Sequence, residues 1–596
     1  MKINQLYIIG GENFKSIDKL DKNSKVVFLD KVQNGFNNEF MLLKNFLESQ
    51  NFLRKKWIKF QEEVFKKIKS KIDYDEDFQY VLSNIFFEAS PNKTDTVYLF
   101  FKLYLIIDYI KKENIKHLFL INVTKEIKTF FELNLTSDSF LVKTVNLRKD
   151  NLFDKNFFNK IEKNNLFFSL FITLINEYKK KRQNISPKKS QSSKVVVSYF
   201  YPGGYSFNDR FKSKFFEDVS GLLNNNYHWL FQYVGKISKI NKENKLLKNN
   251  FTTFSFLDAY FNTKDFLNVV TKYFKIRKKL QSIKVDKLFI FEEINYSCLF
   301  KNDWLTSITI LLVKLLIFEK KISNFFLKNE HVEEILYMME YQPWEQMLNK
   351  IAKKHKIITK GVTHSIIRPN IMNYYHSNLI HKYFHTPSLV GANSDFSKLL
   401  LLKNGFTKDQ VLEIEAHRFN YLADSKSKII PNNSQIKKTI LIITSNILKE
   451  TTELLENFVL SKVKFEKIYI KEHHLLPVSS IIKTSIKNFP KYEIFQGTVL
   501  EAFRCSNIIY VANGSSVLFE SVIKKKQTVS LVSLATLPIP AIEKANNLFF
   551  VSNVADLSNI LNTLISNANS EPNLSEVENY LYLDNGLRLW RDFLKK

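Results

Sequence analysis

The 596-residue sequence predicts an α/β protein built from several consecutive domains. Continuous apolar runs of strand length recur along the chain, as is typical of strands buried on both faces of a parallel sheet. Amphipathic stretches of helical length separate these runs, so strands and helices alternate. At roughly 100–200 residues per domain, the length allows three to five structural units.

Residues 1–178 are expected to form an N-terminal α/β domain. Short apolar runs predict strands at Gln5–Ile9, Lys25–Leu29 and His117–Asn122. Helical patterns cover Phe40–Lys69 and Val97–Ile110. The following stretch, Lys179–Lys194, combines charge, Ser, Gln and one Pro without apolar periodicity, which predicts an exposed basic linker.

Residues 195–425 and 426–596 are expected to form two Rossmann-like domains. In the first, strands are predicted at Lys194–Tyr199, Lys287–Phe291, Ile335–Met339, His355–Thr359 and Gly361–Thr363. In the second, they are predicted at Lys438–Thr444, Phe465–Ile470, Asn507–Val511, Thr528–Leu534 and Asn547–Val551, before an amphipathic segment at Leu587–Lys596. Two such domains facing each other place a cleft between the carboxyl ends of two sheets, where ligands of this fold bind.

Composition excludes several classes of protein. Hydrophobic residues make up 45% of the chain, which rules out a disordered protein, and two cysteines rule out a disulfide scaffold or thiolate zinc module. Lys and Arg number 88 against 59 Asp and Glu, a net charge of +29. Such charge suits nucleic acid, anionic lipid or a phosphorylated substrate, but no nucleic-acid-binding signature is present, so nucleic acid is not expected.

The chain is expected to be soluble and cytoplasmic, with basic surface available for the inner face of the cytoplasmic membrane. The start, MKINQLYIIGG, lacks the cleavage site of a signal peptide and reads as a strand. The longest apolar run, Trp304–Phe318, is shorter than the roughly 20 residues that a membrane span needs, and Lys314 interrupts it. We therefore expect it to form a buried helix.

The segment Asn513–Glu520 contains a candidate nucleotide site at the end of a predicted strand. Gly514 permits a tight turn and Ser515 or Ser516 can cap the helix that follows, whose first N–H groups favour a phosphate. Glu520 lies one helical turn beyond Ser516 and can accept both hydroxyls of a ribose. The alternative is a capped helix with a solvated Glu520.

A second candidate site follows the strand predicted at Phe465–Ile470. Lys471 and His473 alternate onto one side if the strand continues, and a cation beside an imidazole suits a phosphate leaving group. The alternative is a polar loop. No cysteine or HExxH pattern accompanies His473-His474, so no metal is expected.

A third group of candidates lies in residues 340–368. Glu340 ends a strand, where a carboxylate facing a cleft can act as a base for an acceptor hydroxyl. Glu345 belongs to the helix that begins at Pro343, and it is either a substrate ligand or an exposed helical residue. His364 follows another strand and can orient substrate or contact phosphate, and Arg368 is a candidate substrate ligand.

An aromatic turn, Tyr199–Tyr205, ends the first strand of residues 195–425. Tyr201, Gly203 and Gly204 are candidate substrate-binding residues because an aromatic ring on a Gly-Gly turn can stack on a sugar or lipid. The alternative is a simple turn. The chain contains no dinucleotide fingerprint, phosphate-binding loop or G-x-S-x-G element.

Together these residues resemble GT-B-fold glycosyltransferases of bacterial surface-polysaccharide assembly, especially those using CMP-activated acidic sugars of the nonulosonate or Kdo type. Those enzymes carry Lys-x-His-Pro after a strand and Ser-Ser or Ser-Thr opening a later helix, both of which bind the CMP phosphate. Lys471-Glu472-His473 and Ser515-Ser516 match these elements, and Glu520 matches a nucleotide-contacting acid. His474 stands where the family has proline, so which histidine acts is left open.

A longer stretch, about residues 190–550, resembles a group of surface carbohydrate biosynthesis proteins of similar length. The resemblance rests on Val195–Gly204, Glu340–Glu345, Gly361–Ser365 and the segment around Ser515-Ser516. It implies a GT-B-like pair of Rossmann-like domains preceded by an additional α/β domain.

The resemblance implies transfer of an acidic sugar from a CMP-sugar to a glycan or glycolipid acceptor, without metal or cofactor. Glu340, His364 and His473 are the expected catalytic residues, with Lys471, Gly514, Ser515, Ser516 and Glu520 on the nucleotide. His473 and Ser516 must then lie near the same nucleotide. The alternatives are a polyol-phosphate or UDP/GDP-sugar transferase of the same fold, or a non-catalytic glycan-assembly scaffold. Oligomeric state and inverting or retaining outcome are left open.

Overall fold

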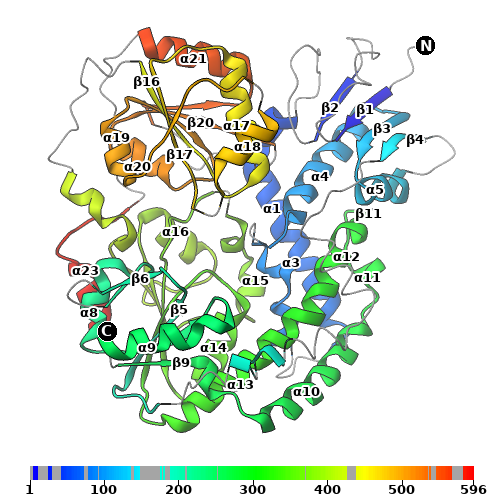
Figure 1. Cartoon of the computed structure of the whole chain (residues 1–596). Helices are drawn as coiled ribbons and strands as arrows, with labels where there is room; N and C mark the ends of the chain where they lie inside the picture. Colours follow the sequence, from blue (N-terminus) through cyan, green and yellow to red (C-terminus); the bar gives the residue numbers. More distant parts are fainter. Residues whose placement is uncertain are drawn as a thin grey trace.

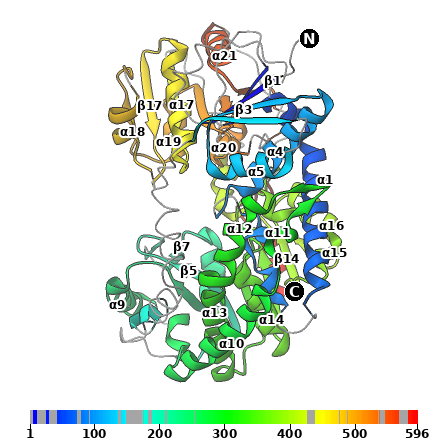
Figure 2. The same ribbon diagram turned by 90° about the vertical axis from the view of Figure 1, so that its right-hand side faces the viewer.

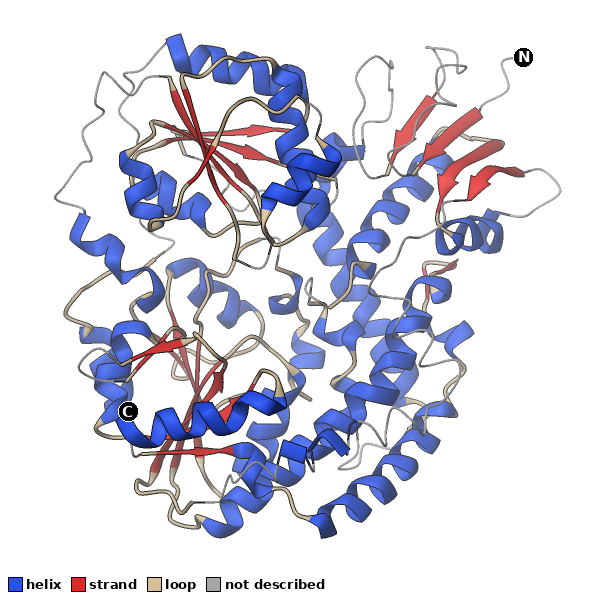
Figure 3. Ribbon diagram, viewed as in Figure 1, coloured by secondary structure: helices blue, strands red, loops and turns tan. Residues whose placement is uncertain are grey.

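The computed structural model has the predicted α/β fold, with three parallel sheets and helices around them (Figures 1 and 3). It describes residues 5–10, 25–29, 42–72, 78–90, 93–135, 140–147, 173, 175–177, 179–180, 188–207, 211–425, 438–566 and 581–596, apart from 252, 370, 475, 487, 535, 538–541 and 543–544. None of the described helices combines the length and apolar character that a membrane crossing requires.

The first Rossmann-like domain has a seven-stranded parallel sheet in the order β15-β14-β13-β12-β5-β8-β9. Read from β9 and numbered along the chain, this is the 3-2-1-4-5-6 Rossmann order with one further strand. Its strands are β5 (Lys194–Phe200), β8 (His228–Tyr233), β9 (Phe254–Phe256), β12 (Glu334–Met338), β13 (Ile358–Val362), β14 (Leu389–Ala392) and β15 (Val411–Glu413). The strand order reverses between β5 and β12.

The second Rossmann-like domain has a six-stranded parallel sheet in the order β18-β17-β16-β19-β20-β21. This is also the 3-2-1-4-5-6 order, with its reversal between β16 and β19. Its strands are β16 (Thr439–Ile443), β17 (Lys467–Lys471), β18 (Glu493–Ile494), β19 (Ile508–Ala512), β20 (Gln527–Leu531) and β21 (Leu548–Val551). The two domains therefore form a GT-B-like pair, stacked one above the other in Figure 2.

Helices cover both faces of these sheets because the connections between parallel strands must cross over. In the first domain they are α8 (Ser220–Asn224), α9 (Ile240–Asn250), α10 (Thr263–Gln281), α11 (Val285–Leu288), α12 (Ser297–Thr306), α13 (Leu312–Lys328), α14 (Pro343–Lys354), α15 (Asn378–His381) and α16 (Asp395–Lys403). In the second they are α17 (Leu448–Ser461), α18 (Val478–Ser485), α19 (Val499–Arg504), α20 (Val517–Ile523) and α21 (Val554–Ser566).

The N-terminal block has its own parallel sheet, in the order β2-β1-β3-β4. Its strands are β1 (Gln5–Ile9), β2 (Lys25–Phe28), β3 (His117–Val123) and β4 (Leu141–Leu147), and its helices are α1 (Leu42–Lys69), α2 (Gln79–Leu82), α3 (Ile85–Glu88), α4 (Thr96–Lys112) and α5 (Lys125–Leu135). Helix α1 contacts α11 and α15, and α4 contacts α12 (Figure 2). One apolar cluster runs through both regions, so the described part of residues 1–178 shares its core with residues 195–425.

The predicted basic linker is not a wholly exposed segment. Residues 181–187 lie outside the described part of the chain, but Ser190 is buried and its N–H donates to Asn329 Oδ1 at 2.6 Å. The backbone carbonyl of Lys188 accepts a hydrogen bond from Tyr260. This end of the linker is therefore packed against the first Rossmann-like domain.

The C-terminal helix α23 (Arg588–Lys595) returns to the first domain rather than completing the second. It packs beside β15, and the two carboxylate oxygens of Glu415 accept the backbone N–H groups of Leu589 and Trp590 at 2.7 and 2.8 Å. The predicted domain 426–596 is thus corrected, because residues 581–596 are held by the neighbouring domain.

Most predicted strands are present, with ends that differ by one to three residues. The prediction at Lys287–Phe291 is wrong, because residues Val285–Leu288 form helix α11 and only Ile290–Phe291 pairs, as the short strand β10 with β11 (Ile294–Asn295). The two long apolar segments are buried helices as expected: α4, and α12–α13 joined by a π-helical turn at Ser307–Leu311.

Candidate functional site

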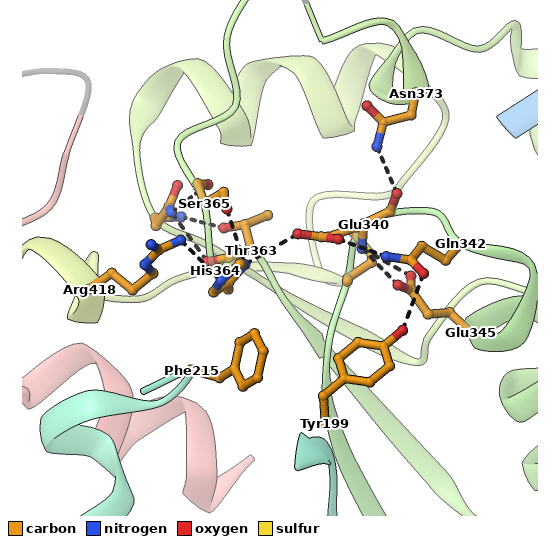
Figure 4. A network of polar contacts seen from close by, with 12 residues as sticks. Tyr199, Phe215, Glu340, Gln342, Glu345, Thr363, His364, Ser365, Asn373 and Arg418 are labelled. Atoms are coloured by element: carbon orange, nitrogen blue, oxygen red, sulfur yellow. Dashed lines mark hydrogen bonds and ion pairs between the residues drawn. The ribbon is translucent and has the colours of Figure 1, made fainter. Parts of the chain in front are cut away.

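The candidate site begins where the strand order of the first sheet reverses, because ligands of doubly wound sheets bind outside the carboxyl ends of the strands at that point. Strand β5 leads into the turn at Tyr201–Gly204, and its neighbour β12 leads into Glu340. The next strand, β13, leads into His364. Sequence-predicted residues from three separate segments therefore meet at one edge of the sheet (Figure 4).

Glu340 is held by contacts on its backbone and side chain. Its N–H donates to both carboxylate oxygens of Glu345, at 3.1 and 3.0 Å, and its carbonyl accepts from Asn373 Nδ2 at 2.8 Å. Gln342 Nε2 donates to Glu340 Oε2 at 2.8 Å. Its carboxylate is fixed but still about one-third exposed, at 35% side-chain accessibility.

The residue after Glu340 adopts an unusual backbone conformation. Tyr341 has a φ of +58° although it is bulky and buried. Such a conformation costs on the order of 1–3 kcal/mol and clusters at functional sites. Pro343 then occupies the first turn of α14, where its missing N–H has no cost. The strained turn lets the chain pass from β12 into α14 while Glu340 stays at the sheet edge.

His364 lies beside Glu340 and contacts its carboxylate. Its Nδ1 is 3.4 Å from Glu340 Oε1 and 3.1 Å from Ser365 Oγ, and Arg418 donates to its Nε2 at 3.2 Å. Because Nε2 accepts from a guanidinium, the network assigns the ring proton to Nδ1, which faces the carboxylate. His364 is therefore a neutral donor that orients Glu340.

The pKa values follow from this arrangement. Burial lowers the pKa of His364, and the nearby Arg418 lowers it further, against the opposing effect of Glu340. Burial alone would raise the pKa of Glu340, but the hydrogen bond and charge of His364, with Gln342, hold it below its usual value. At neutral pH the pair is an ionised carboxylate and an uncharged imidazole.

Glu345 does not contact the cleft as a substrate ligand would. It is 2% exposed, and burial together with the neighbouring Glu340 raises its pKa well above the usual value. Its carboxyl group accepts the backbone N–H of Glu340, so it is a positioning residue beneath the site. The expected alternative of an exposed helical residue is likewise wrong.

The aromatic turn after β5 lies at the same edge. Gly203 has a φ of +79°, and a Cβ on Gly204 would come within 2.5 Å of the Tyr201 ring, so both positions require glycine. The half-buried Tyr201 ring lies 5.6 Å from the ring of Phe215, which in turn lies 5.8 Å from His364. The turn places an aromatic surface near His364.

The second sheet contributes the loop after β19. Ser515 Oγ accepts the N–H of Val517 at 3.3 Å, and both Ser515 and Ser516 are half-exposed. Arg368, from the first domain, donates to the carbonyl of Gly514. Burial lowers the pKa of Arg368 to about 10, against the attraction of the nearby Glu450. Arg368 therefore joins the two domains at the site, and its predicted role as a substrate ligand is not the contact observed.

Glu520 is buried at 5% exposure and accepts a hydrogen bond from Tyr421. Burial raises its pKa, while Tyr421 and the charge of Arg418 act in the opposite direction. Tyr421 belongs to the segment His417–Ser425 that leads out of the first domain. A ribose must take the place of the Tyr421 hydroxyl to reach this carboxylate.

Lys471 is the last residue of β17 and His473 lies two residues further on; β17 is next to β16 on the side away from β19. Lys471 Nζ donates to the carbonyls of Gly497 and, at 3.4 Å, Phe495, so it holds the loop after β18 instead of pointing freely into the cleft. His473 is half-buried, and its N–H donates to Thr444 Oγ1 at 3.2 Å beyond the end of β16. The loops carrying His473 and Ser516 thus flank the end of β16 at the same sheet edge.

Arg418 is a functional candidate that the sequence did not single out. It is exposed, it contacts His364, and its charge acts on Glu340 and Glu520. The lone charged residue in HRFNYL carries no motif, so only the tertiary structure brings it between the two domains' sites. Among the described residues, no group of three or more His, Cys, Asp or Glu is arranged to hold a metal ion.

The chain is similar to several solved structures of bacterial proteins. UDP-GlcNAc 2-epimerase from Neisseria meningitidis bound to UDP-GlcNAc is 12% identical, with a TM-score of 0.36, over 67% of this chain and 99% of its own. Anabaena HepE in complex with UDP and glucose is 10% identical, with a TM-score of 0.35, over 65% of this chain and 92% of its own. Acinetobacter baumannii MurG is 11% identical, with a TM-score of 0.33, over 67% of this chain and 98% of its own. No family model and no curated protein matches the sequence. The fold assignment rests on the strand orders of the two sheets.

Proposed function

We propose that this protein is a glycosyltransferase that moves a sugar from a nucleotide-sugar donor to a glycan or glycolipid acceptor. The observation that carries the proposal is the ionised, partly exposed Glu340, oriented by His364 at the switch point of the first sheet. A carboxylate fixed in this way suits a reaction at a sugar carbon. The hydroxyls of Ser515 and Ser516 at the switch point of the second sheet suit the nucleotide.

In the proposed reaction the acceptor hydroxyl loses its proton to Glu340 as its oxygen bonds to the anomeric carbon. The bond from that carbon to the phosphate oxygen breaks, and the nucleotide leaves with the electron pair. If configuration is retained, Glu340 instead attacks the anomeric carbon and a second displacement follows. His364 keeps the carboxylate ionised and directed in either case.

Positive charge and hydroxyls of the chain stabilise the leaving nucleotide in this proposal. Arg418 has an exposed guanidinium beside His364, which suits bidentate contact with a phosphate. Ser515, Ser516 and His473 supply further donors from the second domain. Lys471 supports them indirectly, because it fixes the loop at Phe495–Gly497.

For the donor we propose a CMP-activated acidic sugar, on the strength of the Lys471-x-His473 and Ser515-Ser516 elements. A UDP-sugar is the second candidate, since the structures with a similar arrangement include complexes with UDP and UDP-GlcNAc. We also propose that transfer takes place at the cytoplasmic side of a membrane, where basic surface can meet anionic lipid.

A thermal-shift screen with CMP, UDP, GDP and CDP-glycerol tests this proposal. A nucleotide at 100 times its dissociation constant stabilises the fold by about 2.7 kcal/mol. Selective stabilisation by CMP supports a CMP-activated acidic sugar as the donor. Selective stabilisation by UDP supports a UDP-sugar, and selective stabilisation by CDP-glycerol supports a polyol-phosphate transferase. Stabilisation by none of them contradicts the enzyme assignment and favours a scaffold.

A paired variant locates the nucleotide. Arg418→Gln removes the exposed cation together with its hydrogen bond to the buried His364, and the shift caused by the preferred nucleotide should shrink. Lys462→Gln, in the loop after α17, removes one positive charge elsewhere in the second domain and should leave the shift unchanged. Equal shifts in both variants would place the nucleotide away from the site.

A further inference from the structure

A separate cavity lies at the carboxyl ends of β8 and β9 in the first domain. It has a volume of about 160 Å³ and is bounded by Gln232 and Tyr233 at the end of β8, by Asp258 after β9, and by Lys314, Phe318 and Lys321 of α13. Glu177 of the N-terminal block and Lys180 of the linker close it. A cavity of roughly 150 Å³ accommodates a six-membered ring, which is far more than one water needs.

The charges that line this cavity are not balanced. Lys321 contacts Glu177 and, at 2.6 Å, Asp258, while Lys180 lies 3.0 Å from Glu177 and 3.6 Å from Asp258. Two ammonium groups and two carboxylates neutralise each other in this cluster. Lys314 adds a further cation at the cavity that is exposed to solvent; no hydrogen bond or ion pair to another described residue engages it, although Glu177 attracts it.

Two polar atoms at the cavity also lack partners. Neither the Gln232 Nε2 donor nor the Asp258 Oδ2 acceptor has a hydrogen bond to any described residue, although both atoms are buried. Buried polar groups in folded proteins are nearly always paired, so unpaired ones need a ligand or water. Burial, with the repulsion of Lys180 and Lys93, lowers the pKa of Lys314, an effect that a bound anion would offset.

The cavity therefore offers one cation, one neutral donor and one acceptor around space for a ring. A carboxylate or phosphate group complements Lys314 and the Gln232 amide, and a hydroxyl complements Asp258 Oδ2. Neutral sugars leave the cation without a partner. Aliphatic anions leave the carboxylate oxygen unpaired.

A chain of contacts connects the cavity to the catalytic carboxylate. The Phe318 ring packs 5.7 Å from that of Trp344, whose Nε1 donates to Gln342 Oε1 at 3.1 Å. Gln342 in turn donates to Glu340. Strands β8 and β12 flank β5, so their ends lie about 10 Å apart at the usual strand spacing.

The helix that carries Lys314 is also irregular next to the cavity. A π-helical turn at Ser307–Leu311 joins α12 to α13 immediately before Lys314. Such turns are rare and are found frequently at functional sites. This irregularity is a second feature, independent of charge, that marks the same place.

We propose that this cavity is an acceptor subsite for a sugar residue that carries a carboxylate or a phosphate. Lys314 and Gln232 bind the anionic group, Asp258 accepts a ring hydroxyl, and the neighbouring unit of the glycan reaches Glu340. The acceptor role rests on the proposed function, whereas binding of the acidic sugar does not.

Ligand-observed NMR with the full-length protein tests the subsite, using glucuronate, glucose 6-phosphate and glucose as probes. The variants are Lys314→Gln, which removes the cation, and Gln232→Glu, which places a carboxylate where the amide stands. Lys328→Gln, at the exposed end of α13, is the matched control for lost charge. A circular dichroism spectrum and a melting curve of each variant verify that it is folded.

Glucuronate or glucose 6-phosphate should bind to the wild type and equally to Lys328→Gln. Binding to Lys314→Gln and Gln232→Glu should be at least about tenfold weaker. Glucose should not bind detectably to any of them. The better of the two anions identifies a carboxylate or phosphate group on the acceptor. No binding, equal binding of glucose, or binding unchanged in Lys314→Gln would overturn the subsite.

A nucleotide titration of the same variants separates the two proposals. CMP and UDP should stabilise Lys314→Gln as they do the wild type, since the cavity lies on the acceptor side. Acidic-sugar binding without any nucleotide binding would leave the subsite in place and contradict the proposed function. Nucleotide binding without acidic-sugar binding would contradict the subsite and leave the proposed function in place.

Discussion

The Nδ1 atom of His364 lies 3.4 Å from Oε1 of Glu340, so the ends of two neighbouring strands, β13 and β12, hold one polar pair. The imidazole is buried and the carboxylate is partly open to solvent. The charge of the Glu340 carboxylate is thus maintained by a buried neighbour.

His364→Ala tests this relationship. Without the Nδ1 donor the pKa of Glu340 should rise toward its usual value or above it, because burial is then opposed only by Gln342 and Arg418. We expect kcat to fall by about 10²-fold, and the acidic limb of the pH–rate profile to move to higher pH, with donor KM little changed. His331→Ala, at an exposed position, is the control. A lower kcat with an unmoved acidic limb would make His364 merely structural.

Arg418→Lys keeps a positive charge but loses the planar, two-pronged donor. If the guanidinium contacts a phosphate through two hydrogen bonds, donor KM should rise about tenfold or more. Since Arg418 also lowers the pKa of His364, that pKa should change little in Arg418→Lys and rise in Arg418→Gln. Initial rates at several donor concentrations, with NMR titration of His364, measure both effects. Unchanged donor KM in both variants would remove Arg418 from the site.

Much of the fold could be predicted from sequence because buried parallel strands read as continuous apolar runs. Of the strands that were not predicted, β9, β14 and β15 are only three or four residues long, too short for a clear pattern. The strand predicted at Lys287–Phe291 was wrong because periodicity cannot distinguish a short buried helix from a strand.

The candidate site could be predicted in part, because polar residues that follow parallel strands share one edge. That rule located Glu340, His364 and Ser515, but it could not foresee that Lys471 and Glu520 are engaged by Phe495–Gly497 and Tyr421. Such contacts join segments that are distant in sequence and leave no local pattern. Arg418 was missed for the same reason.

Buried histidines make the fold sensitive to acid. Burial lowers the pKa of His376 to about 3, so below pH 6.5 the unfolded chain binds a proton that the folded chain does not. Stability should therefore fall, as pH drops from 6.5 toward 3, by about 1.4 kcal/mol per pH unit for this group. His417 at about 3 and His228 and His381 at about 4 add to the effect.

His376→Phe keeps the ring contacts with Tyr341 and Phe384 and removes the titrating group. Urea unfolding at pH 7 and pH 5 should show a smaller loss of stability than in the wild type, by about 1–2 kcal/mol. The exposed His331→Phe should not alter the loss. An identical loss in His376→Phe and the wild type would show that the folded and unfolded chains protonate His376 equally, which contradicts a lowered pKa.

Glu415 fastens the C-terminal helix to the first domain. Glu415→Ala removes the acceptors of two backbone N–H groups, that of the buried Trp590 and that of the partly buried Leu589, and charged hydrogen bonds of this kind contribute about 1.5–3 kcal/mol each. Trypsin should then cleave at Arg588 and Arg591 faster than in the wild type. Glu413→Ala, which breaks only a half-exposed pair with Lys398, should have little effect. Equal protection in both variants would show that the Trp590 side chain alone holds the helix.

The central claim is that Glu340 performs the transfer chemistry at the first switch point while the second domain holds the nucleotide. The most direct measurement is nucleotide release from CMP-N-acetylneuraminate and UDP-GlcNAc by the wild type and Glu340→Gln, with nucleotide affinity determined on the same samples. Gln342 remains to hold the amide in place of the carboxylate, and Asn373 still holds the backbone carbonyl of residue 340. We predict that Glu340→Gln loses at least about 10³-fold in turnover while binding the nucleotide as tightly as the wild type. Turnover within a few-fold of the wild type would contradict the account.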